Sequence, residues 1–221
     1  MRSVRRAFFL PILAAALLAP ALAIGGEPTA AERESARRLM DEGKEKTKSK
    51  DLEGALVAYG KAHGIMHVPT TGIALARTHL ALGHLVEARD VALEVARFPK
   101  ERNEPAVFES ARADAREIEA STKDRIPTLR VKVKGPAPSA LSIDGAAISA
   151  TLFDTPLAVN PGHRVVVVAN KAGVERKAEV DVAEREKKTV ELELPEEPKG
   201  GTTPAPTSTS STGPAPTASA S

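Results

Sequence analysis

Two histidines stand at the one spacing in this sequence that could support metal chemistry. His63 and His67 are four residues apart, which would place both imidazoles on one face of a helix, where they can hold a metal ion with a third ligand. No Glu or Asp accompanies them in a metalloprotease pattern, and Pro69 indicates that the helix ends there. We therefore interpret the pair as polar residues at a helix terminus, and we expect neither a metal nor a cofactor.

The remaining residue types indicate no reactive centre. Cysteine is absent, which excludes disulfides, thiol nucleophiles and Cys-based zinc sites. No Ser lies in a Gly-x-Ser-x-Gly turn, and no Gly-rich loop joins a strand to a helix as in nucleotide-binding proteins. Aromatic residues make up 3% of the chain and Trp is absent, so little is available to stack on sugars or bases. The sequence therefore predicts a protein that is not an enzyme.

Residues 1–23 have the pattern of a signal peptide. Arg2, Arg5 and Arg6 precede an apolar stretch over residues 7–24, and Ala21-Leu22-Ala23 has the small-x-small form of a cleavage site. The alternatives are a retained membrane anchor and, because Arg5-Arg6 is followed by an apolar run, a twin-arginine signal. We expect an exported protein of the periplasm or cell envelope, or a secreted one.

The charges of the chain balance once that segment is set aside. The sequence has 31 Lys and Arg against 29 Asp and Glu, and residues 1–23 hold three of the Arg and no acid, which leaves 28 basic and 29 acidic residues. Both signs are interspersed, whereas a nucleic-acid-binding protein needs an uncompensated basic face. We therefore expect no nucleic acid partner.

The segment from Thr29 to Lys123 has the apolar spacing of helices and contains an internal repeat. A shift of 33 residues aligns small and apolar positions, such as Ala55 with Ala88 and Leu52 with Leu85. Helix-turn-helix repeats need small residues where two helices cross closely. Over about residues 36–99 the sequence resembles the tetratricopeptide repeat family.

A single capping helix is expected after the two repeats. Asn103-Glu104-Pro105 would open it, and it would end before Pro127. One apolar stripe would face the repeats: Val107, Phe108, Ala111, Ala115 and Ile118.

The family resemblance implies an inner surface that binds a peptide segment. The family geometry would place seven residues on it: Arg37, Met40, Lys44, Lys48, Ile73, Arg77 and Leu80. Because this set combines cations with apolar side chains, it favours an acidic or C-terminal peptide. The alternative is that these cations only keep the helix surface soluble.

After Pro127 the apolar period changes from 3.6 to 2, which predicts strands. Residues 165–168 are apolar on both faces and should form a central strand, and Asp144-Gly145 should form a tight hairpin turn. Together with Thr155-Pro156 and Asn160-Pro161-Gly162, this pattern resembles the PEGA-type module, a small β-sandwich of bacterial envelope proteins. The alternative is a different sandwich, of the transthyretin-like or immunoglobulin-like type.

The sequence thus predicts an α+β protein of two sub-domains, a helical one over 24–126 and a small antiparallel β-sandwich over 127–195. Residues 196–221 are rich in Pro, Thr, Ser and Ala and are expected to form a disordered tail. We expect a non-catalytic adaptor of the cell envelope that binds a protein or peptide partner, including an envelope or cell-wall component. The alternative is a structural spacer or tether without a specific ligand.

Overall fold

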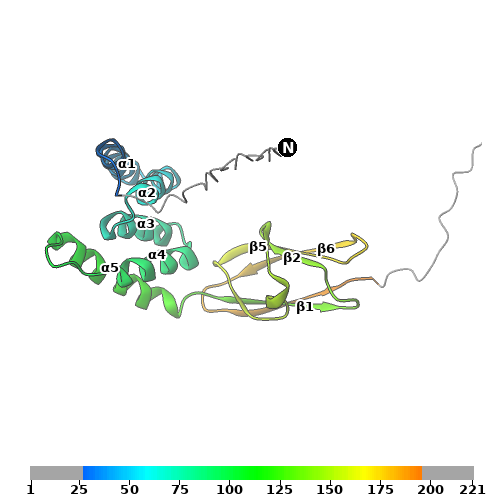
Figure 1. Cartoon of the computed structure of the whole chain (residues 1–221). Helices are drawn as coiled ribbons and strands as arrows, with labels where there is room; N and C mark the ends of the chain where they lie inside the picture. The colour runs from blue at the N-terminus through cyan, green and yellow to red at the C-terminus, as the bar shows by residue number, and fades with distance from the viewer. Residues whose placement is uncertain (1–26, 196–221) are drawn as a thin grey trace, which may run out of the picture.

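The computed structural model describes residues 27–195, in which five α-helices are followed by seven β-strands (Figure 1). The predicted signal peptide and the predicted tail both lie outside the described residues. The helices are α1 (Ala30–Lys48), α2 (Leu52–Met66), α3 (Pro69–Ala81), α4 (Leu85–Arg97) and α5 (Ala106–Lys123). None of the helices within residues 27–195 is both long and apolar enough to cross a membrane.

Local capping fixes where the first helices begin. Thr29 and Glu32 form a capping box at the start of α1, in which each side chain binds the other residue's backbone N–H. At the start of α2 the Asp51 side chain accepts a hydrogen bond from the Gly54 N–H at 2.9 Å. Short connections separate successive helices, so α1 pairs with α2 and α3 with α4.

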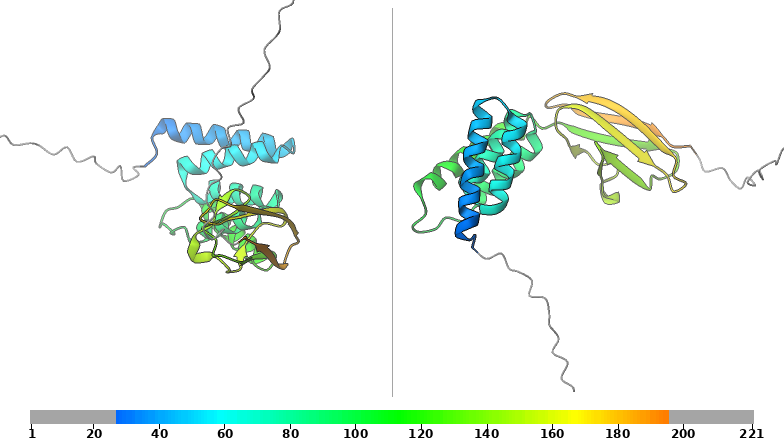
Figure 2. Two further views of the ribbon diagram at one scale, coloured as in Figure 1. Left: turned by 90° about the vertical axis from the view of Figure 1, so that its right-hand side faces the viewer. Right: turned by 90° about the horizontal axis from the view of Figure 1, so that it is seen from above.

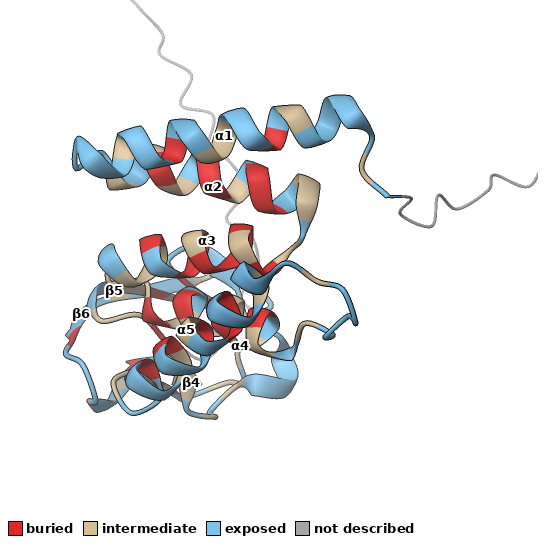
Figure 3. Ribbon diagram, turned by 90° about the vertical axis from the view of Figure 1, so that its left-hand side faces the viewer, coloured by how far each residue is buried: buried red, intermediate tan, exposed pale blue. Residues whose placement is uncertain are grey.

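Small side chains lie where the helices cross. Ala55 of α2 and Ala88 of α4, the pair aligned by the 33-residue shift, are both fully buried. Gly43 of α1 has the Tyr59 ring against it, and a Cβ at this glycine would come within 2.5 Å of Tyr59 Cε1. Figure 3 shows the buried positions of α1 and α2 on the sides that face each other. The predicted close helix crossing at these positions is confirmed.

The α5 helix differs from its predicted buried stripe at one end. Ala111, Ala115 and Ile118 are buried, but Val107 is 57% exposed. Arg112, by contrast, is buried, and the carboxylates of Glu104 and Glu109 contact its guanidinium. The prediction for Val107 is wrong because the apolar period does not show how far the neighbouring helix extends over the first turn.

The strands form two sheets. They are β1 (Thr128–Lys134), β2 (Ala140–Ile143), β3 (Ala146–Ala147), β4 (Leu157–Ala158), β5 (Gly162–Ala169), β6 (Glu175–Val182) and β7 (Lys187–Glu193), with a 3₁₀ turn at Ala150–Leu152. One sheet has the order β4-β1-β7 and the other the order β3-β2-β5-β6. As predicted, β5 is a central strand, and Asp144 and Gly145 form the β2–β3 turn with φ angles of 51° and 81°.

The prediction of a purely antiparallel β region is wrong, because β1 and β7 pair in parallel. The apolar alternation shows which face of a strand is buried but not the direction in which the strand runs. Lys132 and Lys134 of β1 lie beside Glu191 and Glu193 of β7, and Lys134 contacts Glu191 at 2.7 Å. Both sheets contribute to one core, which includes Leu129 and Leu192 from the first sheet and Val166 and Val168 from the second.

The helical and β parts lie side by side and contact each other at two places (Figure 2). Asn160, in the turn before β5, binds the first turn of α4. Arg125, which follows α5, makes two hydrogen bonds to Glu184 in the turn before β7, at 2.8 and 2.7 Å. The change from helix to strand falls between Lys123 and Thr128, around the predicted boundary at 126/127.

Candidate functional site

Arg77 of α3, one of the residues predicted to bind a peptide, lines two neighbouring hollows. One hollow, of about 260 Å³, lies between α3 and α5. The other, of about 250 Å³, lies between α3 and the facing parts of α1 and α2. The side chain of Arg77 is 59% exposed. Its guanidinium is therefore available to a ligand that occupies either hollow.

The hollow towards α5 combines a polar pair with apolar walls. The Arg77 Nη2 donates a hydrogen bond to Asp114 Oδ2 at 2.7 Å, and Asp114 is 40% exposed. Leu80 and Ile118 supply the apolar surface. This is the only hydrogen bond of the Arg77 guanidinium within residues 27–195, so its other N–H groups and the second Asp114 oxygen can bind further polar groups.

The hollow towards α2 is lined more by uncharged side chains. Its lining residues include Thr47 at the end of α1, Tyr59 of α2 and Thr78 of α3. The Tyr59 hydroxyl lies 3.5 Å from the Thr47 hydroxyl, and the Tyr59 ring is packed against α1. The Thr47 and Thr78 hydroxyls donate to the carbonyl oxygens of Gly43 and Ala74, so they can offer only acceptor lone pairs to a ligand in this hollow.

The predicted cations of α1 are paired within their own helix. Arg37 contacts Glu34 at 2.9 Å, and Lys44 and Lys48 make the same kind of contact with acids three residues earlier. All three side chains are exposed, and none of them lines the two hollows around Arg77. A concentrated positive potential for an acidic peptide is therefore not formed by these residues, since each cation has an adjacent carboxylate.

The three predicted apolar residues differ in position. Ile73 is buried in the core between α3, α4 and α5, so it is removed from the predicted surface. Met40 is half-buried and packs against the buried cluster formed by Ala55, Tyr59 and Leu75. Leu80 lines the hollow towards α5.

Sequence reasoning missed the contribution of α5, which was treated only as a cap. Asp114, Glu117, Ile118 and Ser121 line the hollow on the α5 side. Asp114 follows Arg77 by 37 residues, whereas the 33-residue shift aligns Arg77 with Ser110, so the repeat spacing does not indicate Asp114.

No protein-family model and no curated protein matches this sequence.

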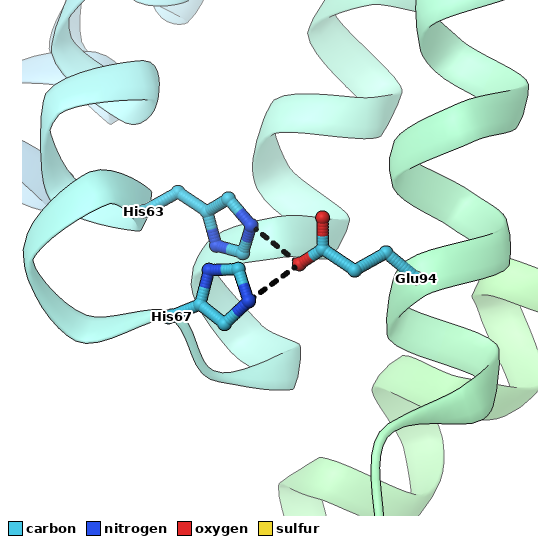
Figure 4. Close-up of side chains that lie close together, drawn as sticks. All are labelled: His63, His67 and Glu94. Atoms are coloured by element: carbon cyan, nitrogen blue, oxygen red, sulfur yellow. Dashed lines mark hydrogen bonds and ion pairs between the residues drawn. The ribbon is translucent and has the colours of Figure 1, made fainter. Parts of the chain in front are cut away.

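A second cluster brings together the histidines that the sequence analysis singled out. His63 Nε2 lies 3.0 Å from Glu94 Oε1, and His67 Nε2 lies 3.3 Å from the same oxygen (Figure 4). The two imidazole rings are stacked, with centroids 4.9 Å apart and an interplanar angle of 22°. Glu94 comes from α4, so no local sequence pattern could have supplied it.

A third hollow, of about 510 Å³, lies where the helical and β parts meet. Asp144 and Arg164 line it and contact each other at 2.6 Å. Burial raises the pKa of Asp144, but hydrogen bonds from the Val165 N–H and from Arg164 outweigh that effect, so its pKa lies below the ordinary value. Asp144 is thus held as a carboxylate that positions its own turn.

Proposed function

We propose that this protein is an exported, non-catalytic adaptor that binds a peptide segment of a partner protein on the helical surface around Arg77. The observation that carries this proposal is the exposed pair of Arg77 and Asp114, which lies between the apolar side chains of Leu80 and Ile118. A guanidinium and a carboxylate side by side can bind the C=O and N–H groups of one peptide unit, while the apolar walls bury a side chain.

This arrangement favours an uncharged or mixed peptide over a strongly acidic one. Asp114 and Glu117 lie in the same hollow as Arg77 and would repel a run of carboxylates. The cations of α1 do not compensate, because they are paired with acids of their own helix. We therefore revise the expected ligand from an acidic peptide to a segment with apolar side chains and accessible backbone groups.

The proposal includes a family assignment for each part. Two helical pairs with buried small residues 33 positions apart support a tetratricopeptide-like arrangement for α1–α4. Two small sheets that share one core support a PEGA-like or related transthyretin-like sandwich for β1–β7. Such pairs of modules suit an envelope protein whose function is contact, and residues 1–23 supply the proposed export signal.

The test is retention of a partner from envelope extract by the immobilised full chain. Reversal of charge in Arg77→Glu should abolish retention, because the introduced carboxylate would repel Asp114 and the donors would be lost from the hollow. Arg37→Glu is the matched control, since Arg37 is also exposed but lies outside both hollows. Equal retention by the two variants would contradict the proposed site.

A structural spacer is the second candidate function, and the junction between the two parts favours it. Asn160 binds α4, and Arg125 binds Glu184 through two hydrogen bonds, so the junction resists bending. A stiff junction is what a spacer needs. Failure of the wild type and of both variants to retain any partner in the experiment above would favour the spacer.

A further inference from the structure

We propose that His63, His67 and Glu94 form a binding site for a single zinc ion. This inference goes beyond the adaptor function and does not depend on it, because the cluster shares no lining residue with the two hollows around Arg77. Two imidazole nitrogens and one carboxylate oxygen are a ligand set that zinc commonly takes, and three protein ligands leave a fourth position for water.

The distances between the three ligand atoms fit one ion. Zinc ligands at about 2.0–2.1 Å in a tetrahedral arrangement lie about 3.3–3.4 Å from one another. Glu94 Oε1 lies 3.0 Å from His63 Nε2 and 3.3 Å from His67 Nε2. All three atoms lie within 4.8 Å of one another, so small side-chain rotations bring them to tetrahedral spacing.

The orientation of the two rings also converges on one point. The rings are stacked, and both Nε2 atoms point towards the Glu94 carboxylate, as Figure 4 shows. His67 ends α2 in the left-handed conformation, with a φ of 47°. This conformation turns the chain after α2, and the His67 ring stacks on the His63 ring while 66% of the His67 side chain stays exposed to solvent.

Thr71 provides the hydrogen bond that a zinc-binding histidine requires on its second nitrogen. His63 Nδ1 lies 2.9 Å from Thr71 Oγ1, and the Thr71 hydroxyl lies 2.9 Å from the Val68 carbonyl oxygen. With the hydroxyl donating to Val68, Thr71 Oγ1 accepts from the Nδ1–H of His63, which leaves the Nε2 lone pair free for the ion. His63 and Thr71 are both buried, so this orientation is held by packing as well.

Gly72 makes room for His63 in this arrangement. A Cβ at Gly72 would lie 3.0 Å from His63 Cε1 and would clash with Val95 Cγ2. The glycine therefore lets α3 approach α4 closely while the imidazole remains between them. The site joins the end of α2 to α4, so a bound zinc ion would connect the first helical pair to the second and stiffen the helical surface.

Calorimetric titration with zinc chloride tests this proposal on the full chain, purified without a polyhistidine tag and stripped of metal. The wild type should bind one zinc ion per chain. His67→Asn and Glu94→Gln should each weaken binding at least ten-fold; Asn tolerates the left-handed conformation of position 67, and Gln keeps the shape of Glu94. The control is His163→Asn, which removes an exposed histidine that lies 3.2 Å from Asp181 and 3.6 Å from Glu179.

The thermal midpoints separate loss of the site from loss of the fold. Without zinc, His67→Asn and Glu94→Gln should unfold near the wild-type temperature; with zinc, only the wild type and His163→Asn should gain stability. The proposal is overturned if the wild type binds no zinc, because the three side chains would then be joined only by hydrogen bonds. It is equally overturned if the His67 and Glu94 variants bind zinc as tightly as the wild type does.

Discussion

The side chain of Asn160 caps helix α4, since its Oδ1 accepts a hydrogen bond from the Val86 N–H at 2.9 Å. His84, which precedes α4, makes no capping hydrogen bond of its own. The Asn160 Nδ2 also donates to Glu87 Oε2 at 2.6 Å. A residue of the β part therefore supplies the cap that the helical part lacks, and the two parts are coupled at this point.

Replacement of Asn160 should destabilise both α4 and the junction. Asn160→Ala leaves the Val86 N–H without its cap, which should lower the free energy of unfolding by about 1 kcal/mol, the usual cost of a lost N-cap. Urea denaturation measures this change, and limited proteolysis within residues 124–128 should become faster. Asn103→Ala is the control, because Asn103 is exposed in a loop. Unchanged stability and unchanged cleavage in Asn160→Ala would contradict the coupling.

Alanine should have opposite effects at two glycines of the helical part. At Gly43 a Cβ would lie 2.5 Å from the Tyr59 ring, so the overpacked Gly43→Ala should be less stable by about 1–2 kcal/mol. Gly64 is an exposed residue of α2 with no atom within 4 Å of an added Cβ. Gly64→Ala should therefore gain about 0.5–1 kcal/mol from helix propensity. Thermal unfolding of both variants measures the two stability changes. A stabilised Gly43→Ala would show that α1 and α2 do not cross as described.

The buried cation of α5 should determine how stability responds to acid. Hydrogen bonds from Arg112 lower the pKa of Glu104 below its ordinary value of 4.5, and they lower the pKa of Glu109 in the same direction. A carboxyl whose pKa is lower in the folded state stabilises the fold fully above pH 4.5, and this contribution is lost as the pH falls through the folded pKa.

Arg112→Met should therefore be less stable than the wild type at pH 7 and should lose less further stability on acidification. Urea denaturation at a series of pH values between neutrality and pH 3 would measure both effects. Arg37→Met is the matched control, because the contact of Arg37 with Glu34 is exposed and should matter little. Parallel pH curves for the wild type and Arg112→Met would contradict this role of Arg112.

The repeat spacing predicted which small residues of the helical half are buried, because close packing leaves little choice of residue. Ala55 and Ala88 are fully buried, and a larger side chain at such a position would separate two helices. A small residue that recurs after 33 positions therefore indicates a helix–helix contact. Period-two patterns likewise predicted the buried faces of other strands, including Leu129 and Val131 of β1 and Leu192 of β7.

Contacts between residues far apart in sequence were not predictable in this way. The approach of Glu94 to His63 depends on how two helical pairs stack, and the parallel pairing of β1 with β7 depends on how the chain crosses between sheets. The burial of Arg112 was not predictable for a related reason, since its charge is compensated by Glu104 from the preceding loop as well as by Glu109 of its own helix.

Site-specific photo-crosslinking in the cells that produce the protein tests the proposed peptide site most directly. A photoreactive amino acid at Ser121, an exposed residue in the hollow between α3 and α5, should form a covalent product with a partner protein, and Arg77→Glu should remove that product. The same amino acid at Val57, which is 56% exposed and lies outside both hollows, should form none. Products of equal yield at Val57 and Ser121, or a Ser121 product that persists in Arg77→Glu, would contradict the account.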